Sequence, residues 1–179
     1  MLSPNIETFL GCDADYTSAD LVLFGAPFDS TTSYRPGARF GPSAMRHESF
    51  GLETYSPYQD ADLTDYAIFD SGDLELCFGS SELALEAIQE RAEVILSDGK
   101  LPLLMGGEHL VTLGAVRAAL NHFPNLHIIH FDAHADLRED YLGVQLSHAC
   151  VLHRCYDLMG DGRIHQFCIR SGDREEFQF

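Results

Sequence analysis

The stretch SSELALEAIQERAEVILSDGKLPLLM, residues 80–105, carries the pattern that decides the fold. Its first part predicts a helix, because apolar side chains recur near a 3.6-residue period from Leu83 to Leu96 and a serine can cap the start. Ser97-Asp98-Gly99 then ends the helix, and an uninterrupted apolar run over residues 101–105 is typical of a buried strand. A helix that leads directly into a buried strand is the repeating unit of a parallel α/β sheet.

The same alternation extends in both directions along the chain. Four further apolar runs have the length and composition of buried strands: residues 21–26, 66–70, 126–131 and 164–169. Residues 110–121 and 147–158 are the expected helices between the later strands. Short continuous strands that alternate with helices predict an α/β fold with a parallel sheet covered on both faces. Ligands of such sheets bind outside the carboxyl ends of the strands, so we expect functional residues just after positions 26, 105, 131 and 169.

Length and charge restrict the class of protein. The 179 residues suit one domain, and the net charge of −17 disfavours binding to nucleic acid or to anionic membranes. No apolar run is long enough to span a bilayer, and the amino end lacks the features of a signal peptide. The five cysteines form no Cys-x-x-Cys pair, which indicates reduced thiols. We therefore expect a soluble cytoplasmic protein with neither nucleic-acid nor membrane partners.

The strongest cluster of chemically active residues is HFDAHAD, residues 130–136, which directly follows the fourth predicted strand. Asp132, His134 and Asp136 occupy alternate positions, so a nearly extended backbone would point all three to one side. Oxygen and nitrogen ligands without a thiolate favour Mn²⁺, Fe²⁺ or Zn²⁺. The alternative is a solvated turn whose acids cap the next helix, and it explains one aspartate better than an alternating set.

Three histidines near this cluster allow two interpretations each. His109 ends the run Met-Gly-Gly-Glu-His after the third strand and is either a fourth metal ligand or an incidental member of a capping turn. His148, which follows Ser147, is either a proton-transfer group near a metal-bound hydroxide or a surface histidine. His130 is either a residue that supports the site or a satisfied polar group of the core.

Other polar and thiol residues are expected to serve the fold. Arg35 and Arg39 lie in the turn-rich loop over residues 27–42, where they would pair with local carboxylates or with a neighbouring subunit. The remaining expectations are structural or solvent-facing roles for His122, His127, His153 and His165, and burial of Cys150, Cys155 and Cys168 as small apolar side chains.

Taken together, five stretches resemble the ureohydrolase family of arginases, agmatinases and their relatives, and most of all its agmatinase branch. They are GAPFDSTTSYRPGARFGP (25–42), GGEH (106–109), HFDAHAD (130–136), LSH (146–148) and IRSG (169–172). The resemblance implies a three-layer α/β/α arginase-like fold and a binuclear Mn²⁺ centre. In that centre His109 and Asp136 would bind one manganese ion, His134 the other, and Asp132 would bridge both.

The resemblance also implies an activity. An agmatinase hydrolyses agmatine, a small cationic guanidino compound, to putrescine and urea, and so serves putrescine and spermidine biosynthesis. His148 matches the family histidine that is implicated in catalysis by proton transfer or substrate contact. Full-length members are commonly trimers or hexamers. The alternatives are another ureohydrolase (a guanidinobutyrase, a formimidoylglutamase or an arginase), a truncated non-catalytic chain, and an unrelated metal-binding α/β domain.

One departure from the family limits these expectations. The family carries a later S-x-D-x-D-x-x-D-P motif with two more metal ligands, and this sequence does not contain it. The family sheet has eight strands in the order 2-1-3-8-7-4-5-6, of which only the first five are expected here. Because the third and fourth strands are not neighbours in that order, we expect a gap in the middle of the sheet. Residues 1–179 are accordingly interpreted as a single ureohydrolase domain that is incomplete at its C-terminus.

Overall fold

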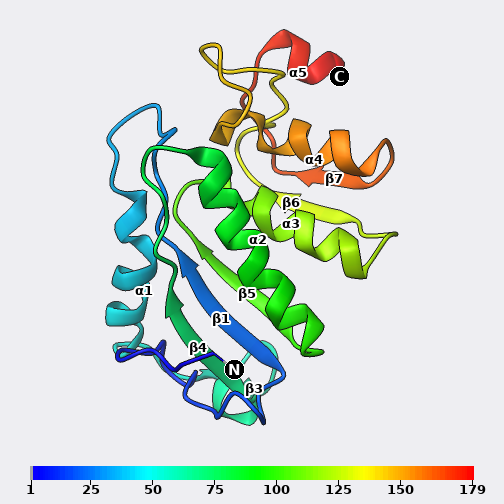
Figure 1. Cartoon of the computed structure of the whole chain (residues 1–179). Helices are drawn as coiled ribbons and strands as arrows, with labels where there is room; N and C mark the ends of the chain where they lie inside the picture. Colours follow the sequence, from blue (N-terminus) through cyan, green and yellow to red (C-terminus); the bar gives the residue numbers. More distant parts are fainter. Residues whose placement is uncertain (1) are drawn as a thin grey trace.

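Two separate parallel sheets form the centre of the structure, a computed structural model that describes residues 2–179 (Figure 1). Strands β1 (Leu21–Ala26), β4 (Ile68–Asp73) and β5 (Leu101–Gly106) pair in the order β4-β1-β5. Strands β6 (Ile128–Phe131) and β7 (Ile164–Phe167) pair with each other. The α/β class and the five expected parallel strands are therefore confirmed, but β5 and β6 are not the buried strands that were expected: Leu101 of β5 is 55% exposed, because both strands lie at sheet edges.

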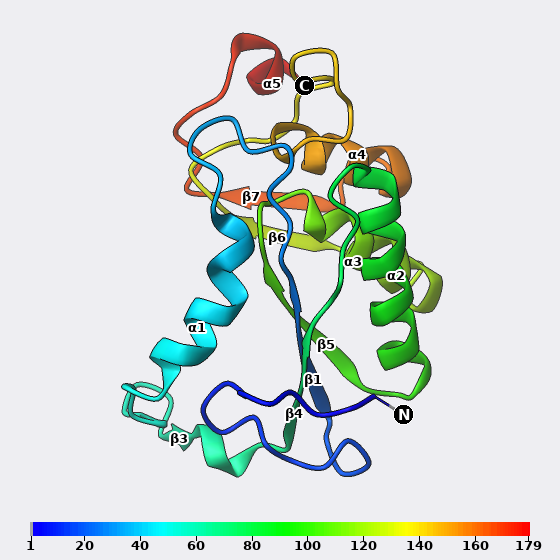
Figure 2. The same ribbon diagram turned by 60° about the vertical axis from the view of Figure 1, so that its left-hand side comes forward.

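Helices cover both faces of the larger sheet. Figure 2 shows α1 (Gly41–Ser49) on one side and α2 (Ser81–Ser97) with α3 (Val111–His122) on the other. Helix α4 (Val151–Met159) packs against α3 and follows a 3₁₀ turn over His148–Cys150. The smaller elements are the hairpin β2 (Tyr55–Ser56) and β3 (Ala61–Asp62), the 3₁₀ turns Ala38–Phe40 and Leu63–Asp65, and α5 (Arg174–Gln178). No helix over residues 2–179 combines the length and apolar character that crossing a membrane requires.

One hydrophobic core joins the two sheets although their strands do not pair. Phe24 of β1, Ile88 of α2 and Val151 of α4 belong to the same buried cluster, and Ile128 and Ile164 of the smaller sheet pack against it. Burial of apolar surface contributes about 25 cal/mol per Å² whatever the strand pairing, so this cluster can hold the sheets together. The helices α2, α3 and α4 thus connect the parts that carry the two halves of the site.

The expected gap in the sheet is present between β5 and β6. Within residues 2–179 these two strands belong to different sheets, so each has an edge without a strand partner. Apolar side chains of the smaller sheet are also uncovered: Ile129 is 67% exposed and Phe131 72% exposed. An apolar face of this kind normally lies against another element.

An ion pair that the sequence analysis did not foresee fixes α1 against the larger sheet. Arg46 of α1 is 2% exposed, and its Nε and Nη2 atoms donate to the two carboxylate oxygens of Asp70 at 2.7 and 2.9 Å. Asp70 lies on β4 and is 1% exposed. Both charges are desolvated, so the bidentate geometry is needed to compensate the cost of burying them.

Several expectations about individual segments need correction. Helix α1 was not predicted: residues 27–42 were interpreted as a turn-rich loop, and no element was assigned to residues 43–49. Pro42 nevertheless stands in the first turn of α1, where a missing N–H costs nothing. The helix expected over 147–158 begins instead as a 3₁₀ turn. Cys150 and Cys155 are buried as expected, whereas Cys168 is exposed and has a φ of +68° in the segment after β7.

Candidate functional site

A cavity of about 530 Å³ opens where β1, β5, β6 and β7 end. This is the place at which parallel sheets bind ligands. All five predicted site residues line it: His109, Asp132, His134, Asp136 and His148. Segments that are far apart in the sequence therefore bring the predicted residues together, as the positions after the strands indicated.

The position of His109 depends on the glycine pair before it. A Cβ atom on Gly107 would lie 2.3 Å from the carbonyl oxygen of Phe28 and 2.5 Å from that of Ala26, so only glycine fits there. The next residue, Glu108, donates its backbone N–H to the Phe28 carbonyl at 2.8 Å. The turn after β5 is thereby held against the loop after β1, and His109 stands two residues before the start of α3.

The three alternating residues after β6 converge by a different route from the one expected. His134 keeps a strand-like bridge to Ser171, but Asp136 has a φ of +51°, so the backbone is not extended through the cluster. In this left-handed conformation, which costs about 1–3 kcal/mol for a non-glycine residue, the Asp136 Oδ2 atom lies 2.6 Å from His109 Nδ1. Asp132 places its Oδ2 atom 3.7 Å from the same nitrogen and its Oδ1 atom 3.6 Å from His134 Nδ1.

His130 supports the site rather than the core alone. The side-chain nitrogen of Gln166 donates to the carbonyl of Ala135 at 2.7 Å, which fixes the orientation of the amide, and the same nitrogen donates to His130 Nδ1 at 3.0 Å. The His130 proton must then be on Nε2, which lies 3.3 Å from Asp132 Oδ2. The ring of His130 also stacks on that of His109. His130 thus orients both neighbours.

The electrostatics of the cluster suit a divalent cation. Burial alone would raise the pKa of the Asp132 carboxyl, but the backbone N–H of His134 and the nearby His109 outweigh burial and hold the pKa below its ordinary value. Burial, with His109 adding to it, lowers the pKa of His130. An ionised carboxylate and a neutral imidazole, the forms that these directions favour at Asp132 and His130, are the forms that bind metal. His109, His130 and Asp132 each offer one ligand atom within 4.8 Å of the others.

The donor set fits manganese by its chemistry. It consists of imidazole nitrogens and carboxylate oxygens, and no cysteine lines the cavity in the described part of the chain. Mn²⁺ and its neighbours in hardness prefer such ligands, whereas softer metals prefer thiolates. The residues present are therefore compatible with the metal that the sequence resemblance implied.

His148 faces the cavity from the 3₁₀ turn before α4. Its backbone N–H donates to the hydroxyl of Thr31 at 3.0 Å, and its ring lies edge-on to Tyr141. Sequence analysis left open whether His148 was a surface residue; the structure makes it a lining residue of the cavity. Sequence analysis did not single out Thr31 or the buried Glu108, although Glu108 stands inside the GGEH stretch.

The far wall of the cavity holds further residues that sequence reasoning missed. Glu176 is buried and accepts the backbone N–H groups of Leu137 at 3.1 Å and Asp173 at 2.8 Å. Arg138 places its Nε atom 3.5 Å from the Glu176 carboxylate. The D-x-x-E spacing of residues 173 and 176 is a capping-box pattern, and it could have marked the start of α5.

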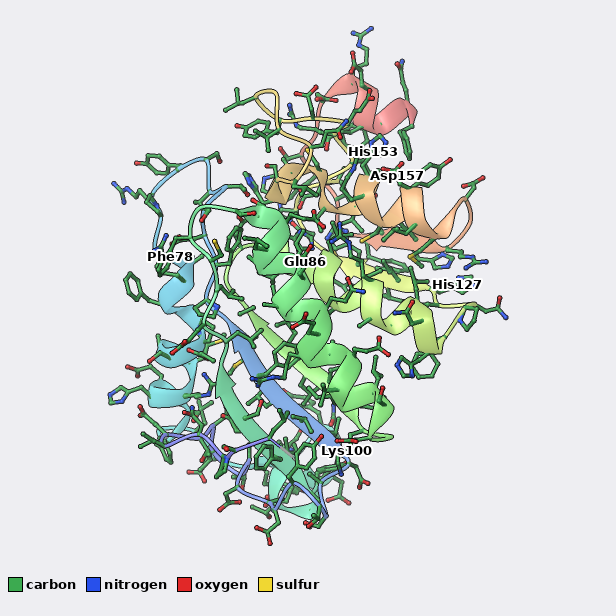
Figure 3. All side chains as sticks on the ribbon, viewed as in Figure 1. Phe78, Glu86, Lys100, His127, His153 and Asp157 are labelled. Carbon is green, nitrogen blue, oxygen red and sulfur yellow. The ribbon has the colours of Figure 1, made fainter. Side chains whose placement is uncertain are left out.

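The residues expected outside the site do lie outside it. Arg39 pairs with Asp29, as predicted for one of the two loop arginines, and its Nε donates at 2.6 Å. Arg35 instead lies over the ring of Tyr34. Figure 3 shows His153 and Asp157 on α4 and His127 near the start of β6. The His153 ring contacts the Leu137 carbonyl, and no lining residue of the cavity is among these.

Comparison with known proteins agrees with this arrangement. A profile described as the arginase family matches residues 19–179. The agmatinase of Bacillus subtilis (strain 168) is 47% identical over 173 residues, which cover 97% of this chain and 60% of that protein. Two solved structures are similar: the agmatine ureohydrolase of Thermoplasma volcanium (TM-score 0.88, 38% identity) and proclavaminate amidino hydrolase from Streptomyces clavuligerus (TM-score 0.84, 30% identity). Each match covers 98% of this chain, and 58% and 62% of the respective structures. The chain therefore spans about three fifths of the length of these relatives.

Proposed function

The chain belongs to the arginase family, and from that premise we propose that the protein is a manganese-dependent agmatinase. The reaction is the hydrolysis of the guanidino group of agmatine, with one water consumed and putrescine and urea released. The likeness to the Bacillus subtilis agmatinase supports agmatine as the substrate. We further propose that this activity serves polyamine synthesis in the cytoplasm.

The observation that carries the proposal is the convergence of four potential metal ligands with a histidine in one cavity. We assign His109 and Asp136 to one manganese ion, His134 to the other, and Asp132 to a position between them. The 2.6 Å contact from His109 to Asp136 and the two contacts of Asp132, at 3.7 Å to His109 and 3.6 Å to His134, support this division. Manganese held by these residues would supply a hydroxide nucleophile at neutral pH.

The residues of this chain would supply binding and proton transfer. The carboxylates of Asp132, Asp136, Glu108 and Glu176 line the cavity and favour a guanidinium over a neutral or anionic group. His148 is the proposed catalytic residue: a neutral imidazole can take up a proton released during attack and return it to the amine that leaves. Its place on the cavity wall is consistent with either contact to the substrate or transfer of that proton.

Two alternatives remain as outcomes of the test. The substrate can be another guanidino compound, because family relatives such as proclavaminate amidino hydrolase carry other names. The second alternative is a non-catalytic chain that binds a single metal ion. The unpaired edges of β5 and β6 favour it, since the sheet under the cavity is interrupted. We propose that residues 1–179 form a single ureohydrolase domain that further chain would complete, and that the full-length form is a homo-oligomer, a trimer or hexamer.

The deciding experiment measures bound manganese and urea release on the same preparation. The purified 179-residue chain is loaded with Mn²⁺, and the metal is counted per chain. Urea is then assayed with agmatine, 4-guanidinobutyrate and arginine, and formamide is assayed with formiminoglutamate, with a His148→Gln variant as the matched control. Two ions per chain and urea from agmatine only in the unchanged protein support the proposal. One ion without urea or formamide from any substrate supports the non-catalytic alternative. Urea or formamide from a substrate other than agmatine would identify that compound as the substrate instead.

A further inference from the structure

Glu108 and Thr31 form a hydrogen-bonded pair between the metal ligands and His148. The Thr31 hydroxyl lies 2.5 Å from Glu108 Oε1, and the Thr31 backbone N–H donates to the same oxygen at 3.0 Å. The other carboxylate oxygen of Glu108 accepts the backbone N–H of Leu110 at 3.4 Å. Glu108 is 8% exposed, so these contacts are made away from bulk water and are correspondingly costly to break.

This pair connects the two parts of the structure that do not share a sheet. Thr31 follows β1 and Glu108 follows β5, both in the larger sheet, whereas His148 precedes α4 beside the smaller one. The loop after β1 rises past the end of the larger sheet to reach the start of α4 (Figure 2). The backbone N–H of His148 donates to the Thr31 hydroxyl at 3.0 Å, and so the hydroxyl bridges the parts.

The hydroxyl has only one proton to give. A carboxylate oxygen that already receives a backbone N–H can only accept from the hydroxyl, so the Thr31 proton points to Glu108. The lone pairs of the Thr31 hydroxyl oxygen then point toward His148, and this oxygen lies 3.4 Å from His148 Nδ1. A hydroxyl in this state can accept a hydrogen bond from a ring N–H and cannot donate one to a ring nitrogen.

We propose that Thr31, held by Glu108, is a positioning residue that keeps His148 in the tautomer with its proton on Nδ1. The inference rests on the proposed function, because it gives His148 the task of proton transfer. In this tautomer Nε2 carries the free lone pair, so the ring is ready to accept a proton through that nitrogen. In this role Thr31 and Glu108 act through the histidine.

A second hydroxyl near the ring supplies the competing explanation. Ser147 Oγ lies 3.3 Å from His148 Nδ1, and a serine that donates to Nδ1 would instead leave the ring proton on Nε2. The two hydroxyls therefore predict opposite tautomers, which nitrogen shifts of the imidazole distinguish. Because the measurement needs no turnover, it stays informative even if the proposed agmatinase activity is absent.

The experiment records long-range proton–nitrogen spectra of the histidine rings in the 179-residue chain, about two pH units above the ordinary imidazole pKa of ~6.5. A His148→Gln variant assigns the signals. The unchanged protein is expected to show the Nδ1–H pattern, Thr31→Val to lose it in favour of the Nε2–H pattern, and Thr31→Ser, which keeps the hydroxyl, to retain it. Ser147→Ala is expected to change nothing.

Two results would overturn the inference. One is an Nε2–H pattern in the unchanged protein; the other is an unchanged pattern in Thr31→Val. Backbone amide spectra recorded on each variant check the fold, and Thr31→Ser keeps the test decisive if the valine variant does not fold. A tautomer that changes in Ser147→Ala and not in the Thr31 variants assigns the positioning role to Ser147 instead.

Discussion

His109 Nδ1 and Asp136 Oδ2 lie 2.6 Å apart, although one residue follows the larger sheet and the other follows the smaller one. The contact requires a left-handed backbone at Asp136 and a glycine at position 107, and neither feature helps the core. Strain that is kept at a cluster of potential metal ligands is typical of a functional site. The site is thus built across a boundary at which no strands pair.

Replacing Asp136 tests its assignment as a metal ligand. Asp136→Asn keeps the size of the side chain and removes its charge, so we expect the affinity for Mn²⁺ to fall at least about tenfold. Calorimetric titration of the metal-free chain measures the change. Asp157→Asn, an exposed carboxylate on α4, is the matched control and should bind Mn²⁺ like the unchanged protein. Equal affinity in both variants would remove Asp136 from the site.

Gly107 is expected to tolerate no side chain. In Gly107→Ala the new methyl group would meet the backbone of Phe28 and Ala26, so the turn after β5 must move. Overpacking of this kind costs about 1–3 kcal/mol in free energy of unfolding. Urea denaturation measures it, and Gly79→Ala is the control, because a Cβ atom there meets nothing within 4 Å. A cost no larger for Gly107→Ala than for Gly79→Ala contradicts the close approach.

The Asp29–Arg39 pair predicts how stability responds to acid. Its hydrogen bond from Arg39, with help from the backbone N–H of Gly37, holds the pKa of Asp29 below its ordinary value of 3.8. A carboxyl with a depressed pKa in the folded state contributes its full stability above the unfolded value. That contribution is lost as the pH falls from 3.8 through the folded pKa.

Substitution of either partner should weaken this acid dependence. We expect Asp29→Asn and Arg39→Met to show a shallower fall in free energy of unfolding below about pH 5 than the unchanged chain. Because Arg39 is partly exposed, the difference should shrink at high ionic strength. Denaturant titrations over a series of pH values measure both effects. An identical slope in Asp29→Asn would show that the pair does not contribute.

The uncovered face of the smaller sheet should make the 179-residue chain bind apolar dyes. Ile129 and Phe131 stand on this face, where Phe131 stacks on Phe167 with ring centroids 5.2 Å apart. Ile129→Thr and Phe131→Thr introduce threonine, a β-branched residue that strands accommodate well. Both variants are expected to lower the fluorescence of bound anilinonaphthalene sulfonate and to raise the solubility of the chain.

A matched substitution separates this patch from general surface polarity. Val94→Thr changes an exposed apolar residue on α2, a helix that covers one face of the larger sheet. It should leave dye binding and solubility unchanged. If all three variants behave alike, the smaller sheet is not the surface responsible.

Local sequence patterns were sufficient to predict helices and strands such as α2 and β5, and to select the candidate site residues. The apolar period before Leu96 and the unbroken run over 101–105 place α2 and β5 within one residue of their observed bounds, since both depend on neighbours in sequence. The DAHAD spacing indicated the site, because side chains of those types have few structural uses in alternation. The break between β5 and β6 followed from the family strand order and not from any property of the intervening residues.

Only the tertiary structure decided how the candidate residues act on one another. The hydrogen bond from the Gln166 amide to His130 Nδ1 determines which ring nitrogen of His130 carries the proton. The left-handed backbone at Asp136 brings its carboxylate to His109. Thr31 contacts His148, which lies 117 positions further along the chain. Each of these contacts joins segments whose approach is set by packing of α2, α3 and α4 around a shared core. A sequence pattern shows the periodicity of apolar residues within one segment. A hydrogen bond between distant segments depends on how those segments are placed relative to each other, and that placement is determined by the packing of the core.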